Sequence, residues 1–140
     1  MIILDTNVLS ALMRTRPDQA VVDWLDRQPS ESVWTTSITV FEARFGLALL
    51  ASVKRRHALE SAFERLLEED LEQRVLAFDA TAATEAATLA AGRRQVGRPV
   101  DLRDTQIAGI ALARHATIAT RNLKHFDDLS VPVVSPWAAL

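Results

Sequence analysis

Short apolar runs alternate with amphipathic segments along the chain. Runs with the length and composition of β-strands occupy residues 2–4, 33–36, 75–78, 117–120 and 131–134. Between them, apolar side chains recur at helical spacing, which predicts helices over about 5–13, 17–27, 37–50, 81–96 and 102–115, and another ending near residue 69. This alternation favours a mainly parallel sheet of about five strands, covered by helices on both faces and joined by right-handed crossovers.

Length and composition agree with one globular domain over residues 1–140. Hydrophobic residues make up 49% of the chain and charged residues 24%, which are ordinary values for a globular protein. Cysteine is absent, so disulfides, thiolate metal sites and cysteine nucleophiles are excluded. The N-terminal segment lacks the basic start of a signal peptide, and no apolar stretch has the length of a membrane span. We therefore expect a soluble, cytoplasmic protein that has no membrane partner.

The charges are unevenly distributed although the net charge is only −2. Residues 58–85 contain eight acidic and two basic residues, whereas residues 92–125 contain seven basic and two acidic residues. The basic segment suits an anionic partner, provided that its side chains converge in space. The alternative is that both segments are solvated helix faces.

Four polar residues are expected at one edge of the sheet. Asp5 ends the first strand, Glu42 lies one turn into the helix after the second, and Asn122 follows the fourth. Asp104 reaches the same edge if its helix begins there. Sites in parallel sheets gather at the carboxyl ends of the strands. Clustered oxygen ligands suit a hard cation such as Mg²⁺, and without a cation the carboxylates would repel one another and raise their pKa values.

Helix capping is the competing interpretation of these residues. Asp5 precedes a helix, and Asp104 stands three residues after the candidate cap Asp101. Residues 39–42 match a capping box, and we expect Ser37 or Thr39 to cap the third helix. Taken singly, each residue is better explained as a cap. Four such residues at one edge of one sheet are harder to explain by four independent caps, so together they favour a site.

Other catalytic plans have less support in the sequence. Phosphate-binding glycine loops, nucleophile elbows and the H-E-x-x-H zinc motif are all absent. His57, His115 and His125 are scattered among basic residues, so we expect them on the surface and expect no histidine-based site. Aromatic residues make up only 6% of the chain, which argues against a base-stacking platform. Contacts with a nucleic acid would therefore be to phosphates.

Four segments in order resemble the PIN-domain family, and within it the VapC and FitB-like toxin ribonucleases of bacterial toxin–antitoxin pairs. They are Ile2-Ile3-Leu4-Asp5-Thr6-Asn7-Val8, Ser37-Ile38-Thr39-Val40-Phe41-Glu42, Asp104-Thr105-Gln106-Ile107-Ala108-Gly109-Ile110-Ala111 and Ala119-Thr120-Arg121-Asn122. The likeness extends from Met1 to the tail around Trp137. It implies a three-layer α/β/α sandwich and a metal-dependent endoribonuclease that hydrolyses RNA phosphodiester bonds.

The resemblance also implies roles for particular residues. The three acidic metal ligands of the family fall on Asp5, Glu42 and Asp104, and Mg²⁺ or Mn²⁺ would be the cofactor. The fourth acidic position of many members falls on Asn122, a departure that weakens the case for a fully occupied second metal site. We group these four as the expected catalytic residues, with Thr6 and Thr120 flanking them in supporting positions.

Partners are implied in the same way. RNA is the expected substrate, and its backbone would be held by residues near the same edge (Arg98, Arg103, Arg121 and Lys124). The family implies a small DNA-binding antitoxin that blocks the site, a homodimer of the toxin, and toxin–antitoxin hetero-oligomers on operator DNA.

Two other functions are kept as alternatives. A PIN-like scaffold could bind RNA or a protein without cutting, for which Asn122 and the acidic balance leave room. A phosphate-transferring domain could use Asp5 as a nucleophile, but it would need a second aspartate just after the first, where Asn7 stands. The intact set of Asp5, Glu42 and Asp104 favours the nuclease.

Overall fold

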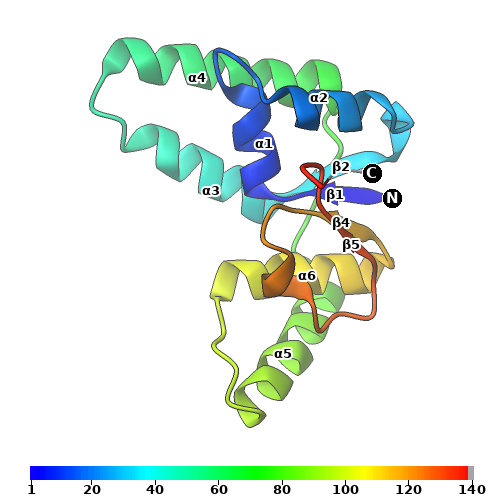
Figure 1. Ribbon diagram of the computed structural model, residues 1–140. Coiled ribbons are helices and arrows are strands. Elements are labelled where there is room, and N and C mark those ends of the chain that lie inside the picture. The colour runs from blue at the N-terminus through cyan, green and yellow to red at the C-terminus, as the bar shows by residue number, and fades with distance from the viewer. Residues whose placement is uncertain (139–140) are drawn as a thin grey trace.

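The computed structural model describes residues 1–138, which form helices and parallel strands in alternation (Figure 1). The strands are β1 (Ile2–Leu4), β2 (Val33–Thr36), β3 (Val75–Leu76), β4 (Thr117–Ala119) and β5 (Val133–Val134). The α-helices are α1 (Thr6–Met13), α2 (Gln19–Asp26), α3 (Ser37–Ala48), α4 (Val53–Arg65), α5 (Ala80–Gln95) and α6 (Leu102–Arg114). Three short turns complete the described chain: 3₁₀-helices η1 (Ser30–Ser32) and η3 (Leu123–Phe126), and a π-helical turn η2 (Leu66–Asp70).

The five strands form one parallel sheet in the order β3-β2-β1-β4-β5. The chain builds outward from β1 through β2 to β3, then returns to the other side of β1 to add β4 and β5. The direction of strand addition therefore reverses between β1 and β4, where Leu4 pairs with Ala119. Ligands of such sheets bind in the crevice that opens beyond the strand ends at this reversal. The predicted parallel α/β architecture is confirmed.

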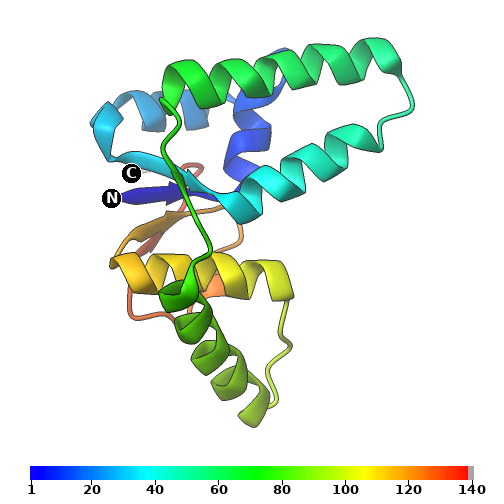
Figure 2. The ribbon, with the colours of Figure 1, turned by 180° about the vertical axis from the view of Figure 1, so that it is seen from behind.

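Helices cover both faces of the sheet and make three layers. Helices α1 to α4 lie on one face, and α5 and α6 lie on the other (Figures 1 and 2). Adjacent residues of β1 serve different cores, because strand side chains alternate: Leu4 packs beneath α1 and α4, and Ile3 packs against α6. Both side chains are fully buried, so the central strand is covered on both faces.

Each α-helix of the described chain begins with a polar side chain that accepts a backbone N–H of its first turn. The caps, in chain order, are Asp5, Asp18, Thr36, Ser52, Asp79 and Asp101. Such caps satisfy N–H groups that have no partner within the helix. The prediction of Ser37 or Thr39 as the third cap is wrong: β2 passes directly into α3, so Thr36 both ends the strand and caps the helix.

Several predicted boundaries also differ from the observed ones. The third and fifth strands are two residues long rather than four, because only Val75–Leu76 and Val133–Val134 pair with a neighbour. The helix expected to reach residue 69 ends as α4 at Arg65 and widens into the π turn η2. No helix within residues 1–138 is long and apolar enough to cross a membrane.

Gly109 lets α5 and α6 approach closely. A Cβ at this position would lie 2.5 Å from the backbone oxygen of Ala82 and 2.7 Å from the Cβ of Ala86. Only a residue without a side chain fits there. The crossing sets the position of α6, whose first turn carries Asp104 to the edge of the sheet.

Candidate active site at the carboxyl edge of the sheet

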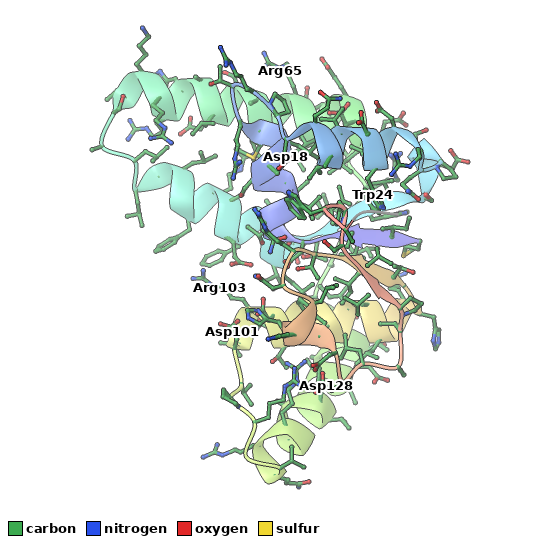
Figure 3. The ribbon with its side chains drawn as sticks, in the orientation of Figure 1. Asp18, Trp24, Arg65, Asp101, Arg103 and Asp128 are labelled. Atoms are coloured by element: carbon green, nitrogen blue, oxygen red, sulfur yellow. The ribbon has the colours of Figure 1, made fainter. Side chains whose placement is uncertain are left out.

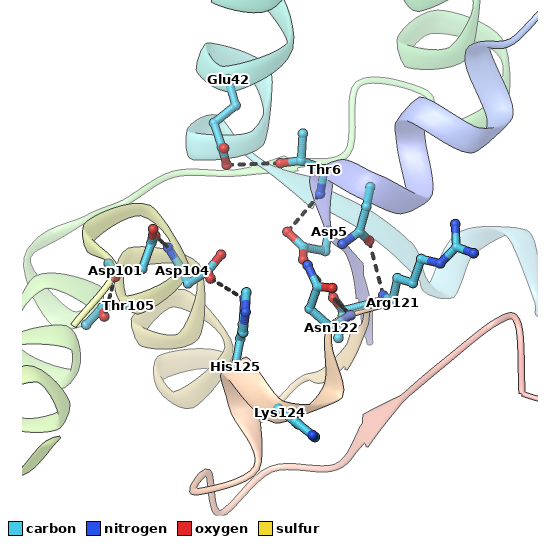
Figure 4. Close-up of polar contacts among 12 residues, drawn as sticks. Asp5, Thr6, Glu42, Asp101, Asp104, Thr105, Arg121, Asn122, Lys124 and His125 are labelled. Atoms are coloured by element: carbon cyan, nitrogen blue, oxygen red, sulfur yellow. Dashed lines mark hydrogen bonds and ion pairs between the residues drawn. The ribbon is translucent and has the colours of Figure 1, made fainter. Parts of the chain in front are cut away.

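Asp5 lies at the reversal point, held between the ends of β1 and β4. Its backbone N–H continues the ladder to the carbonyl of Ala119 at 2.9 Å. Oδ2 accepts a hydrogen bond from the Thr120 hydroxyl at 2.8 Å, and Oδ1 accepts the N–H of Thr6, also at 2.8 Å (Figure 4). The side chain therefore caps α1 and also faces the crevice, so the capping and site interpretations are not exclusive. Asn122, the fourth residue that the sequence analysis expects at this edge, follows β4 there.

Glu42 approaches Asp5 from α3. Its Oε1 accepts a hydrogen bond from the Thr6 hydroxyl at 3.0 Å, and its Oε2 lies 3.6 Å from Nη1 of Arg103 on α6. The capping box expected at residues 39–42 is wrong, because Thr39 lies within α3 and donates its N–H to the Thr36 hydroxyl at 3.1 Å. Glu42 therefore does not cap α3, and its carboxylate accepts a hydrogen bond from Thr6 at the start of α1.

Asp104 enters the site from the first turn of α6. Its own N–H is capped by Asp101 Oδ1 at 2.9 Å, and its carboxylate Oδ2 accepts a hydrogen bond from His125 Nδ1 at 2.8 Å (Figure 4). His125 belongs to η3, which begins directly after Asn122. Its side chain is 53% exposed, as expected of a surface histidine, and its ring contacts the site through Asp104, a contact that the sequence pattern does not predict. The sequence feature that could indicate this contact is the position of His125 three residues after Asn122, in a turn rather than on a helix face.

The four residues expected at the sheet edge line one cavity of about 620 Å³. Asp5 and Asn122 follow the ends of β1 and β4, Glu42 lies in the second turn of α3, and Asp104 lies in the first turn of α6. Their side chains surround a common space in Figure 4. The structure therefore brings together residues that are up to 117 positions apart in the sequence. The polar wall also includes Asp101, His125 and three arginines, Arg14, Arg103 and Arg121.

Burial and mutual repulsion perturb the two aspartates. The pKa of Asp5 is raised from 3.8 to about 6, chiefly by burial and in smaller part by the charges of Asp104 and Glu42, against hydrogen bonds from Thr120 and Thr6. The pKa of Asp104 is also raised, first by burial and then by the charge of Asp101, although His125 opposes the shift. Carboxylates whose ionised forms are disfavoured in this way gain most from a bound cation.

The donor set fits a hard divalent cation. It consists of carboxylate and amide oxygens, which Mg²⁺ and Mn²⁺ accept. Within residues 1–138, no group of three or more His, Cys, Asp or Glu side chains lies close enough together to hold a metal ion as placed. The fit to Mg²⁺ therefore rests on the chemistry of the oxygen donors, since Mg²⁺ takes few carboxylates and keeps several waters.

The four expected RNA-binding cations divide between two neighbouring cavities. Arg103 and Arg121 line the acidic cavity, whereas Arg98 and Lys124 line a second cavity of about 440 Å³ that shares Asp104 and His125 with the first. Arg103 projects toward α3, where its guanidinium lies over the rings of Phe41 and Phe45 (Figure 3). Arg98 pairs with Asp127 at 2.6 Å. The segment's positive charge is thus partly neutralised within the protein.

The fold and the site define an α/β protein with an acidic cleft at the reversal point of a parallel sheet. A family model described as the PIN domain matches residues 2–131, so the chain belongs to the PIN domain family, as the sequence motifs led us to expect.

Three curated relatives match almost the whole chain. The chain is 41% identical to the plasmid stability protein StbB of Pseudomonas syringae pv. tomato, over 99% of this chain and 100% of the relative. It is 38% identical to the VapC ribonuclease Y4jK of Sinorhizobium fredii, over 98% of each chain. It is 36% identical to the toxin FitB of Neisseria gonorrhoeae, over 98% of this chain and 99% of the relative.

A solved structure agrees with the fold over its full length. The structure of FitAB bound to an IR36 DNA fragment contains a chain that superposes with a TM-score of 0.89 and 35% sequence identity. The match covers 100% of this chain and 98% of that one.

Proposed function

We propose that this protein is a metal-dependent endoribonuclease that serves as the toxin of a type II toxin–antitoxin pair. The observation that carries the proposal is the convergence of Asp5, Glu42 and Asp104, with Asn122, in one cavity at the reversal point of the sheet. The family supports it, because two of the relatives above are named a ribonuclease and a toxin.

Asp5, Glu42 and Asp104 would hold Mg²⁺ or Mn²⁺ through their carboxylate oxygens. A divalent ion bound there supplies activation of a water and charge compensation for phosphodiester hydrolysis. Thr120 and Thr6 orient the Asp5 and Glu42 carboxylates by hydrogen bonds, so the ligands are fixed before RNA arrives. Asn122 adds a neutral amide in place of a fourth carboxylate, so the site carries three acidic ligands.

Basic side chains at the cavity rim would contact the RNA backbone. Arg121 lines the acidic cavity and Lys124 lines the adjoining one, and both side chains belong to exposed residues after β4. Contacts to phosphates from this rim would position the RNA without specifying its sequence.

A DNA-binding antitoxin is the proposed partner. The solved FitAB complex is bound to a DNA fragment, and its matching chain has the same fold as this protein over its full length. We extend the proposal to a homodimer of the toxin and to hetero-oligomers with the antitoxin in the cytoplasm.

Cleavage of RNA by the purified chain tests the enzymatic proposal. Labelled single-stranded RNA is incubated with the protein in Mg²⁺, in Mn²⁺ and in EDTA, alongside Asp104→Asn as the inactive variant. We expect cleavage with either metal by wild type alone and none in EDTA. Cleavage that continues unchanged in EDTA rejects the metal mechanism. RNA binding without cleavage in either metal would favour the scaffold alternative.

Expression in a bacterial host tests the biological role. We expect the chain alone to arrest growth, and we expect growth to recover when the neighbouring gene is expressed with it. Normal growth of cells that accumulate folded, active protein would contradict the toxin assignment.

A further inference from the structure

We propose that His125 and Arg93 form a clamp that positions Asp104 as a metal ligand. The inference rests on the proposed function, because it deepens the role of the same acidic cavity. The clamp consists of four side chains, Asp104, His125, Arg93 and Thr105, which come from α5, α6 and η3.

The first contact joins Asp104 to His125. The imidazole donates from Nδ1 to Oδ2 of the carboxylate over 2.8 Å. One hydrogen bond to one oxygen fixes the rotation of the carboxylate and leaves the other oxygen to an incoming ligand. Hydrogen bonds of this kind to metal ligands set their direction, and their loss typically lowers metal affinity or activity 10–100-fold.

The second set of contacts fixes the backbone that carries His125. Arg93 is only 4% exposed, and its Nη2 donates to the carbonyl of His125 over 2.8 Å. The same guanidinium forms a two-point bond with Asp128, from Nε and Nη2, both over 2.8 Å. Asp128 lies beside η3, facing the end of α5 (Figure 3). Arg93 therefore attaches the η3 turn to α5.

The third contact returns the chain of bonds to Asp104. Nη1 of Arg93 donates to the Thr105 hydroxyl over 3.3 Å, and Thr105 is the next residue after Asp104. The ring is thus closed: Asp104 to His125, His125 to Arg93, Arg93 to Thr105, and Thr105 to Asp104 through the peptide bond. Arg93 contacts the backbone of His125 and the side chain of the residue next to Asp104, so it fixes the separation of the Asp104–His125 pair.

Burial makes this ring stiff. A buried guanidinium that loses a partner is left with an unpaired charge in a low-dielectric site, which is strongly unfavourable. Arg93 satisfies four donor contacts in one geometry, and the planar fork permits little rotation. The position of η3 relative to α6 is therefore held more firmly than a surface turn would be.

Metal binding without RNA tests the histidine. Mg²⁺ and Mn²⁺ are titrated into the full chain by calorimetry, with His125→Ala, His125→Asn and the exposed α4 residue His57→Ala as the control. Asparagine places a donor nitrogen where Nδ1 stands, so it preserves the bond. We expect affinity to fall tenfold or more in His125→Ala, to stay within about threefold in His125→Asn, and to be unchanged in His57→Ala. Equal affinity of His125→Ala and wild type, or equal losses in both His125 variants, would overturn the proposal.

A second variant tests the arginine. Arg93→Lys keeps the charge and loses the two-point bond, and the double variant with His125→Ala shows whether both act through Asp104. We expect Arg93→Lys to lose about as much metal affinity as His125→Ala. The double variant should bind metal no more weakly than the weaker-binding single variant. If Arg93→Lys does not fold, Asp128→Asn weakens the same bond more gently. A folded variant with lower stability and unchanged metal affinity would give Arg93 a purely structural role and overturn its part in the clamp.

Wild-type binding separates the two proposals. If wild type binds neither metal, the proposed function fails, and the clamp fails with it. If wild type binds and His125→Ala binds equally well, the proposed function stands and the clamp alone is rejected.

Discussion

The hydroxyl of Thr120 donates a 2.8 Å hydrogen bond to Oδ2 of Asp5, across 115 positions of sequence. The bond joins the ends of β4 and β1, the neighbouring strands between which the direction of strand addition reverses. It also holds a carboxylate that is only 4% exposed, beside two other carboxylates whose charges raise its pKa. Because its pKa is raised, the ionised Asp5 carboxylate lowers the stability of the folded protein at neutral pH.

Asp5→Asn should stabilise the metal-free protein at neutral pH. The folded pKa of Asp5 is about 6 against an ordinary 3.8, so its favourable contribution is complete below pH 3.8 and is lost as pH rises through 6. Asparagine stays neutral, so its advantage should grow over this window toward at most about 3 kcal/mol. Thermal or urea unfolding in EDTA between pH 3.5 and 8 measures the difference. A constant deficit of the variant at every pH would show that Asp5 acts only as a cap.

Mg²⁺ should raise the melting temperature of wild type and have little effect on Asp104→Asn. A ligand that binds the folded state alone stabilises it by mass action, by about 2.7 kcal/mol at a hundred times its dissociation constant. Asp79→Asn is the matched control, because Asp79 caps α5 and does not line the cavity. The Asp79→Asn variant should lose at most about 1 kcal/mol of unfolding free energy at any metal concentration. An equal response of wild type and Asp104→Asn to metal would reject Asp104 as a ligand.

Gly109→Ala should destabilise the α5–α6 pair, whereas Gly92→Ala should not. The added methyl at Gly109 would lie 2.5 Å from a backbone oxygen, and we expect a cost of about 1–3 kcal/mol as the helices move apart. At Gly92 nothing lies within 4 Å of the new methyl, so the higher helix propensity of alanine should add about 0.5–1 kcal/mol. Denaturant unfolding of both variants measures this, and equal effects would contradict the close crossing.

Lys124→Ala should weaken RNA binding and reduce its dependence on salt. Each phosphate contact to single-stranded RNA releases counterions, so the slope of log affinity against log salt should fall by about 0.7. Lys54→Ala, in the first turn of α4, is the matched control and should leave the slope unchanged. Fluorescence anisotropy in EDTA, which prevents cleavage, measures both. An unaltered slope in Lys124→Ala would place the RNA elsewhere.

Local sequence determined the order of the elements and most of their boundaries. β2 begins and ends at the residues that its apolar run indicates, and Asp101 caps α6 as its position predicts. These features depend on neighbours within one turn or on strand alternation, so a sequence contains them directly. Thr36 ends β2 and also caps α3, so neither the strand pattern nor the helix pattern alone identifies it as the cap.

The sequence by itself also determined which residues reach the site. Parallel strands point the same way, so polar residues that follow them share one edge, and this predicts the positions of Asp5, Glu42 and Asn122. Only the tertiary structure decided how their side chains bond. The partners of Glu42, Asp104 and Arg93 lie on other elements, and no periodic pattern encodes them. Those contacts depend on the crossing of α5 and α6 and on the path of η3, which close packing of the whole molecule sets.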